Sequence, residues 1–229
     1  RQGIALLLAR STLQSNPRKP EIDIYDNNIG DYMKVITIGD IDYSRTKIQN
    51  NIKKTYKLSL EGEHNNWYKE AQDFGTDVAK LFDIPLSKVL GIVSVLSPLR
   101  EWELNKKQAI EFIASGDCGH MKNNKKKAKD ILSLDVDSAL EYNILKIING
   151  QKTTAFYLNM MYPNRSDYVT IDRHAVAIAI GRNATENEQV LNGKQYTFLR
   201  DCYIMVAIKL GLAPLHLQSI TWQTWKRLK

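Results

Sequence analysis

The stretch that decides the fold runs from Leu145 to Arg182 and reads LKIINGQKTTAFYLNMMYPNRSDYVTIDRHAVAIAIGR. Two of its segments, Thr153–Met161 and Arg173–Ile180, lack Gly and Pro and are rich in apolar and helix-forming residues. They predict two helices. Lys152 directly precedes the first helix and Asp172 directly precedes the second. A proline, an asparagine and a serine between the two segments predict a break in the chain.

The length of this stretch allows the two helix starts to meet. A helix from Lys152 to Met161 rises roughly 15 Å, and the segment from Tyr162 to Ile171 can span up to roughly 30 Å. The chain can therefore return along the first helix and bring Asp172 close to Lys152. Helix starts also carry free N–H groups and partial positive charge, which suits a phosphate group. We expect an amine and a carboxylate to face one space there.

This stretch resembles the core of the helix-hairpin-helix DNA glycosylases, the endonuclease III-like superfamily. The family pattern is L-P-G-V-G-x-K-T-A, a short helix, and then V-D-T-H-V. The residues that fall on it in order are Gly150, Lys152, Thr153, Asp172 and His174. The resemblance extends over about Ser87 to Arg182, because two upstream segments also resemble the family. They are Leu96-Ser97 with Asn105-Lys106, and Lys127-Ala128.

The sequence departs from the family pattern at the hairpin. Ile148 stands where the family has its first hairpin glycine, and Ile147 stands where it has proline. Leu99 lies near the position of the expected glutamine. A second, wider pattern, NNWY…LSP…W…N…K…IDRHA…G…W from Asn65 to Trp225, resembles uncharacterised proteins of tailed-phage genomes.

Helical periodicity along the rest of the chain predicts an all-α protein of about ten helices. The resemblance implies a glycosylase-like arrangement, with an active-site cleft between two helical subdomains. We expect residues 1–43 to be a partly irregular N-terminal extension, with strand character at Lys34–Ile38, and residues 44–229 to be the helical domain. The hairpin and the aspartate lie within residues 145–182. The further predicted helices begin near Tyr43 and cover Asn66–Phe82, Val89–Leu96, Glu103–Ala114, Lys125–Leu132, Ser138–Ile148, Tyr196–Leu210 and Leu215–Leu228.

Composition limits the classes of partner and compartment. The net charge of +7 fits a polyanionic partner and also fits solubility alone. Two cysteines, Cys118 and Cys202, cannot hold a four-cysteine iron–sulfur cluster and favour a reduced, cytosolic setting. For a phage-encoded protein that setting is the cytosol of the bacterial host. The apolar run Ile4–Ala9 is too short for a signal-peptide core or a membrane span.

The resemblance implies base excision from DNA, with Lys152 as nucleophile and Asp172 as the carboxylate that activates it. A lysine that attacks the sugar displaces the base and forms a Schiff base, which permits strand cleavage by β-elimination. A fixed carboxylate stabilises the positive charge that develops on the sugar. In the family, His174 supports the aspartate, and we expect Asn105 to be structural as well. Outside the family context, Lys152 also fits a solvated surface residue and Asp172 an ordinary N-cap.

A base can reach such a pocket only when it is flipped out of the duplex. The candidate wedge and stacking residues are Leu99, Arg100, Trp102, Trp67 and Tyr68, although periodicity favours a core position for Trp67. Phosphate contacts are expected from the hairpin turn and from the lysine-rich segment before it, which also fits a solvated surface. The residues are Ile148, Asn149, Gly150, Gln151, Thr153, Lys122, Lys125, Lys126 and Lys127.

The expected partner is double-stranded DNA, bound by a monomer without a membrane. We expect no metal ligands in the chemistry and no resident cofactor, although the resemblance allows an alkali ion at the hairpin carbonyls. Three alternatives remain open from the sequence. They are a catalytically inactive protein that senses modified bases in DNA, an enzyme that edits hypermodified phage bases, and a helical adaptor without DNA affinity.

Overall fold

A computed structural model describes residues 33–61, 66–164 and 168–229. The chain divides into two units, residues 1–31 and residues 32–229, and the fold described here is that of the second. Most of the expected N-terminal extension therefore lies outside the described residues. The second unit begins earlier than the boundary predicted after residue 43, because Ile38 and Tyr43 are buried in its core.

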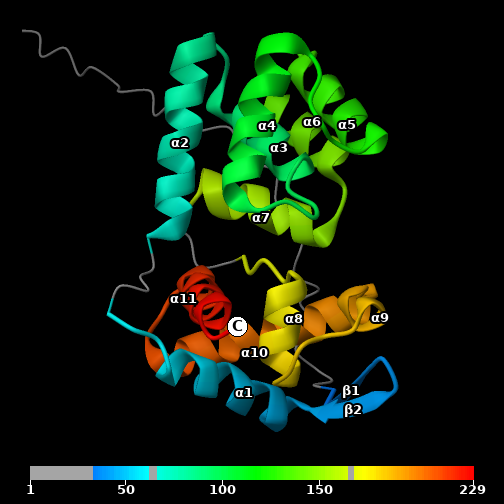
Figure 1. Ribbon diagram of the computed structural model, residues 1–229, viewed down its shortest axis with the longest axis vertical. Coiled ribbons are helices and arrows are strands. Elements are labelled where there is room, and N and C mark those ends of the chain that lie inside the picture. Colours follow the sequence, from blue (N-terminus) through cyan, green and yellow to red (C-terminus); the bar gives the residue numbers. More distant parts are fainter. Residues whose placement is uncertain (1–32, 62–65, 165–167) are drawn as a thin grey trace, which may run out of the picture. The chain divides into compact units, whose positions relative to one another are not determined.

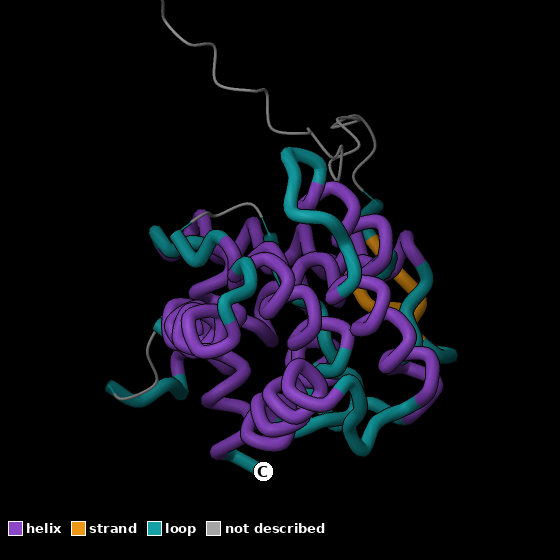
Figure 2. Tube along the Cα trace, turned by 90° about the horizontal axis from the view of Figure 1, so that it is seen from above, coloured by secondary structure: helices purple, strands orange, loops and turns teal. Residues whose placement is uncertain are grey.

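The described residues are almost entirely helical, as predicted, apart from one short antiparallel hairpin (Figures 1 and 2). Its strands β1 (Val35–Ile38) and β2 (Ile41–Ser44) pair Val35 with Ser44 and Ile38 with Ile41. The helices are α1 (Arg45–Lys57), α2 (Trp67–Phe82), α3 (Leu86–Val95), α4 (Trp102–Ser115), α5 (Lys122–Leu132), α6 (Leu140–Ile148), α7 (Gln151–Met161), α8 (Arg173–Ile180), α9 (Glu186–Gln189), α10 (Gly193–Leu210) and α11 (Pro214–Arg227).

Three features differ from the sequence-based expectation. Helix α5 begins at Lys122, although the sequence predicted a loop up to residue 124. The short helix α9 was not predicted; it begins with a reciprocal capping box between Thr185 and Glu188. The strand character near Ile38 develops into a full hairpin, which covers α10.

Helices α2 to α7 form the half of the molecule that we call the contiguous half, residues 67–161. Its centre is α3, which packs against α2, α4, α5, α6 and α7. Residues 88–95 of α3 are all buried, as the continuous apolar run Val89–Val93 in its sequence would require. A Cβ on Gly91 would lie 3.0 Å from Ile144 Cγ2, so this glycine lets α6 approach α3 closely.

The hairpin β1–β2, α1 and helices α8 to α11 form what we call the split half, residues 33–58 and 168–229. Here α1 packs against α8, α10 and α11, although these helices lie more than a hundred positions away in sequence. Asn51 Nδ2 donates a hydrogen bond to Ala179 O at 2.9 Å and joins the two segments. The apolar core of this half includes Ile48, Ile52 and Tyr203, which are buried.

In Figure 1 the contiguous half lies above the split half. The connections between them run from α1 to α2 and from α7 to α8. Taken singly, no helix of the described ranges is both long and apolar enough to cross a membrane. The pair α10–α11, which bends by 99°, meets that test only when its two helices are joined.

Candidate active site

A cavity of about 680 Å³ lies where the two halves meet, which is within the range of small-molecule pockets. Its wall includes Lys152 from the contiguous half and Asp172 from the split half. Lys152 and Asp172, which the sequence predicted to share one space, therefore both line this cavity. The other predicted residues that line it are Trp67, Tyr68, Leu99, Arg100, Trp102, Asn105 and His174.

Lys152 is the second residue of α7 and follows a two-residue turn after α6. Asn149 closes α6 in the left-handed conformation at φ 43°, and Gly150 is the extended N-cap of α7. A Cβ on Gly150 would lie 2.9 Å from Thr153 Oγ1, so a larger residue would disturb the turn. Lys152 is half-buried, and its amine makes no hydrogen bond or ion pair with any described residue. The amine is therefore available to a ligand in the cavity.

Asp172 is the N-cap of α8, and its Oδ1 accepts a hydrogen bond from Ala175 N at 2.8 Å. The capping role and the position in the cavity wall occur together in this one residue. The cap fixes the carboxylate at the helix start, while the second oxygen has no hydrogen-bond donor among the described residues. The carboxylate is therefore oriented by the backbone and can still interact with a ligand.

Tyr196, on α10, contacts the backbone just before Lys152 and just before Asp172. Its buried hydroxyl lies 3.3 Å from Gln151 O, directly before Lys152, and 3.0 Å from Val169 O. The same hydroxyl accepts a hydrogen bond from Ile171 N, directly before Asp172, at 3.3 Å. One side chain thus positions the starts of α7 and α8 relative to each other. Tyr196 could not be identified from the sequence, because it lies far from both residues along the chain.

Aromatic side chains form much of the cavity wall. The ring of Trp67 lies 5.0 Å from that of Trp102, 5.7 Å from that of Trp222 and 6.0 Å from that of Phe156, between ring centroids. Trp67 is half-buried in this wall, so the predicted core position for it is wrong: its helix turns it towards the cavity. Phe156 and Trp222 were not predicted, because no local pattern distinguishes them from core aromatics.

A chain of buried hydrogen bonds lies under these rings and joins the two halves. Tyr68 Oη lies 2.8 Å from Gln218 Oε1 and 3.0 Å from Thr170 Oγ1. Asn159 Nδ2 donates to Thr170 Oγ1 at 3.1 Å. Burial raises the pKa of Tyr68, so its hydroxyl stays protonated. Tyr68 therefore acts as a buried polar link as well as a part of the wall.

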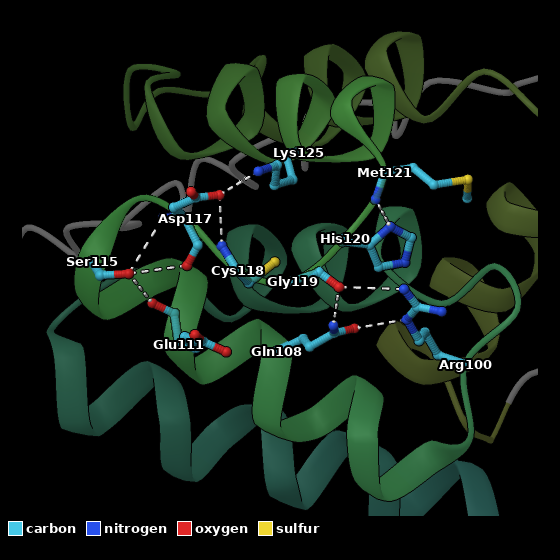
Figure 3. A network of polar contacts seen from close by, with 10 residues as sticks. All are labelled: Arg100, Gln108, Glu111, Ser115, Asp117, Cys118, Gly119, His120, Met121 and Lys125. Atoms are coloured by element: carbon cyan, nitrogen blue, oxygen red, sulfur yellow. Dashed lines mark hydrogen bonds and ion pairs between the residues drawn. The ribbon is translucent and has the colours of Figure 1, made fainter.

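The turn between α3 and α4 presents Leu99 at the cavity. Leu99 has a left-handed backbone at φ 60° and is 70% exposed, which is unusual for a leucine. Arg100 is held instead within a polar network (Figure 3). Its Nε donates to Gln108 Oε1 at 3.1 Å and its Nη2 donates to Gly119 O at 3.3 Å. Of the two predicted wedge residues, Leu99 is the exposed one and Arg100 braces the turn.

The predicted DNA-binding lysines are largely engaged within the protein. Lys125 Nζ pairs with Asp117 at 2.5 Å (Figure 3), and Lys126 Nζ pairs with Asp130 at 2.9 Å. Lys127 Nζ donates to Ile148 O at 2.8 Å. Lys122 is exposed at the start of α5. The lysine-rich run is thus less available to phosphates than its sequence suggested.

The same contact bears on the alkali ion that the resemblance allows at the hairpin. The ammonium of Lys127 already occupies the carbonyl of Ile148, at the end of α6. A second cation there would face like-charge repulsion. The hairpin residues therefore do not fit an alkali ion at this carbonyl. The Ile148 side chain is buried, so the hairpin offers its backbone rather than this side chain to a ligand.

The two residues expected to be structural occupy different environments. Asn105 is buried, and its Nδ2 donates to Val93 O at 3.2 Å, which ties α4 to the central helix. His174 lies in the cavity wall with its ring centroid 6.3 Å from that of Trp222. Burial lowers the pKa of His174, and Asp172 acts in the opposite direction. The imidazole is therefore neutral near pH 7.

An ion pair crosses the rim of the cavity. Glu101, from the contiguous half, lies 2.9 Å from Lys226 Nζ and 3.9 Å from Arg173 Nη2, both from the split half. The hydrogen bond from Lys226 holds the pKa of Glu101 below its usual range. The residues around α9, Glu186 to Val190, close another side of the rim.

Comparisons with known proteins identify the family of this chain but assign it no function. No curated protein and no solved structure matches it. The profile of one family matches residues 35–229, which include every element of the described fold. The chain therefore belongs to the family of unknown function DUF7178.

Proposed function

We propose that this protein is a DNA N-glycosylase of the helix-hairpin-helix type that also cleaves the strand at the abasic site. The observation that carries the proposal is the amine of Lys152, without a partner among the described residues, in one aromatic-walled cavity with the capped carboxylate of Asp172. The α6–α7 hairpin that presents Lys152, and the helix start that presents Asp172, occur in the order that the resemblance predicts.

Lys152 acts as the nucleophile in this proposal. Its neutral amine forms a bond to C1′ of the target nucleotide while the bond from C1′ to the base breaks, and the electron pair leaves with the base, which takes up a proton. The sugar ring then opens to a protonated Schiff base on Lys152. Loss of a C2′ proton allows the C3′–O bond to break, which cleaves the strand by β-elimination.

Asp172 stabilises the charge that develops in this reaction. The sugar becomes cationic as the base departs, and a carboxylate fixed beside it lowers the energy of that state. The N-cap hydrogen bond from Ala175 restrains the carboxylate, so little reorganisation is needed when the charge appears. Asp172 can also accept the proton that the Lys152 ammonium must lose before attack.

The aromatic wall and the exposed leucine serve base flipping. Trp67, Phe156 and Trp222 offer ring faces on which a flipped base can stack. Leu99 is exposed on a tight turn beside the cavity and can fill the gap that the base leaves in the duplex. The start of α7 has no side-chain cap among the described residues, so its N–H groups can bind a DNA phosphate.

The test is reductive trapping. The protein is incubated with duplexes that each carry one damaged or modified base, in the presence of borohydride, which reduces a Schiff base to a stable amine. We expect covalent protein–DNA complex with at least one duplex and its loss in Lys152→Gln. The matched control Lys129→Gln, which removes an exposed lysine on α5, keeps full trapping.

Two results would count against the proposal. Undiminished trapping by Lys152→Gln would show that another amine is the nucleophile. Binding to DNA with modified bases, without base release or trapping on any substrate, would favour the alternative of a protein that senses modified bases.

A further inference from the structure

A second basic region lies on the split half, apart from the lysine-rich segment Lys122–Lys127 of the contiguous half. We propose that the solvent face of α1 and the end of α11 bind the phosphate backbone of duplex DNA. We call this region the α1–α11 surface. The inference rests on the proposed function in taking duplex DNA as its ligand. The residues that form the surface are Lys47, Lys53, Lys54, Lys57, Arg227 and Lys229.

Helix α1 carries basic residues on its solvent face and no acidic residue along its length. Its opposite face, with Ile48 and Ile52, is fully buried in the core of the split half. Lys47, Lys54 and Lys57 are exposed. A solvated helix face usually mixes both signs of charge, because opposite charges three or four positions apart stabilise the helix. The solvent face of α1 lacks such stabilising pairs of opposite charge. Its positive charge therefore favours binding of an anion from outside the protein.

The end of α11 adds further basic residues next to the end of α1. Arg227 Nη2 donates a hydrogen bond to Leu58 O, directly after α1, at 2.7 Å. Lys229 Nζ lies 5.7 Å from the centre of the Trp225 ring. Because α1 packs against α11, the two basic helix ends form one region. Cations near helix C-termini are favourable in themselves, but that effect does not extend to Lys47 in the first turn of α1.

A comparison with α5 shows which lysines are available to a polyanion. On α5, Lys125 and Lys126 are paired with carboxylates and Lys127 donates to a carbonyl. On α1, Lys54 and Lys57 make no hydrogen bond or ion pair with any described residue. Partners within the protein reduce the charge that α5 presents outwards, whereas Lys54 and Lys57 of α1 have no such partner among the described residues.

The α1–α11 surface is separate from the cavity wall, because none of the residues that line the cavity comes from α1. Lys226 lines the cavity rim, whereas Arg227, about 100° further round α11, contacts the end of α1. From Lys47 to Lys57 the helix rises about 15 Å, which matches roughly four phosphates of one strand at about 3.4 Å each. The positive face of α1 is therefore long enough to follow a strand of duplex DNA, the ligand that the proposed function requires.

The experiment compares two variants that each remove three positive charges. One is the triple variant Lys53→Gln, Lys54→Gln and Lys57→Gln; the other, the matched control, is Lys80→Gln, Lys107→Gln and Lys129→Gln on the contiguous half. Affinity for a fluorescein-labelled undamaged duplex is measured by anisotropy across a series of salt concentrations. The slope of log K against log salt should become shallower by about 0.9 for each phosphate that the first variant no longer neutralises. The slope of the control should stay unchanged.

The outcomes separate this proposal from the glycosylase proposal. Equal salt slopes for the two triple variants would overturn the α1–α11 surface, even if Lys152 traps DNA. A shallower slope in the first variant, together with no trapping by the wild type on any substrate, would keep the surface and overturn the glycosylase. Binding of the wild type to vesicles with anionic lipids, abolished in the first variant while duplex affinity is unchanged, would assign the surface to a membrane and overturn the inference.

Discussion

The two halves of the molecule are built differently, although each supplies one member of the proposed catalytic pair. The contiguous half is one run of chain folded around α3 and contributes Lys152. The split half joins the beginning of the described chain to its end and contributes Asp172. The cavity therefore depends on the alignment of two separately packed cores. Contacts that cross between the halves should affect function more than contacts within either half.

The largest expected effect comes from the split half's own contribution to the chemistry. Asp172→Asn removes the negative charge but leaves an oxygen that can accept the hydrogen bond from Ala175. We expect base release to fall by about 10²–10³-fold, with the melting temperature nearly unchanged because Asn and Asp are similar N-caps. Single-turnover kinetics and thermal melts measure the two quantities.

Asp172→Ala serves as the control for capping, since it should lower stability by about 0.5–2 kcal/mol as well as activity. Base release by Asp172→Asn within a few-fold of wild type would remove Asp172 from the proposed mechanism.

The second prediction concerns Tyr196, a residue of the split half that contacts the start of α7 in the contiguous half. Tyr196→Phe removes the hydroxyl that contacts Gln151 O and Ile171 N. A displacement of about 1 Å between reacting groups can cost about 10²-fold in rate. We expect the single-turnover rate to fall by about 10-fold to 100-fold while duplex affinity stays within about twofold, because the groups that bind DNA are unchanged.

Tyr203→Phe is the matched control, because it removes another buried hydroxyl from α10, one that lies 3.4 Å from Ala175 O. It should lower stability without the same loss of rate. Equal losses of rate in Tyr196→Phe and Tyr203→Phe would mean that Tyr196 supports the fold in general and does not specifically position the two helix starts.

The third prediction concerns an ion pair whose two residues both lie in the split half. Glu188 forms a two-point ion pair with Arg182, at 2.5 and 2.8 Å, and accepts a hydrogen bond from Thr185 N. The Arg182 guanidinium lowers the pKa of Glu188 to about 2. A carboxyl with a lowered pKa stabilises the fold above its unfolded pKa of about 4.3, and this contribution is lost as the pH falls towards about 2.

Glu188→Gln should therefore lower the melting temperature at pH 7 and should differ less from wild type as the pH falls from about 4 to about 2. Melting curves across this range measure the difference. A stability gap that does not narrow at low pH would mean that the ion pair is not its source.

The smallest effect concerns the exposed ion pair that crosses the rim. Glu101→Gln weakens the contact with Lys226, but the Glu101 side chain is 64% exposed. Exposed ion pairs contribute about 0–1 kcal/mol, so we expect little change in stability and at most a few-fold change in substrate affinity. Thermal melts and anisotropy measure both. A loss of folding in this variant would mean that the rim pair, rather than the buried chain at Tyr68, joins the halves.

The sequence predicted individual helices well, because a period of 3.6 residues is a local property. Arg173–Ile180 was predicted with the observed bounds, and the buried character of α3 followed from its continuous apolar run. The short helix α9 was missed because four residues are too few to show a period. Chain length showed only that Lys152 and Asp172 could face one space, and the family resemblance singled out this pair; both residues line the same cavity.

What the sequence could not predict were contacts between distant segments. Tyr196 positions both helix starts from 45 and 25 positions away. The lysines of α5 looked available in the sequence because the partners Asp117 and Ile148 are brought to them only by the fold. Trp67 fits a core period equally well, and only the cavity between the halves distinguishes its position from a core position.

The most direct test of the proposed chemistry is to locate the covalent bond. Complex trapped by borohydride is digested with a protease, and mass spectrometry identifies the residue that carries the reduced sugar fragment. We expect the fragment to be attached to Lys152. A fragment on any other amine, with the Lys152 peptide unmodified in the trapped complex, would contradict the proposal.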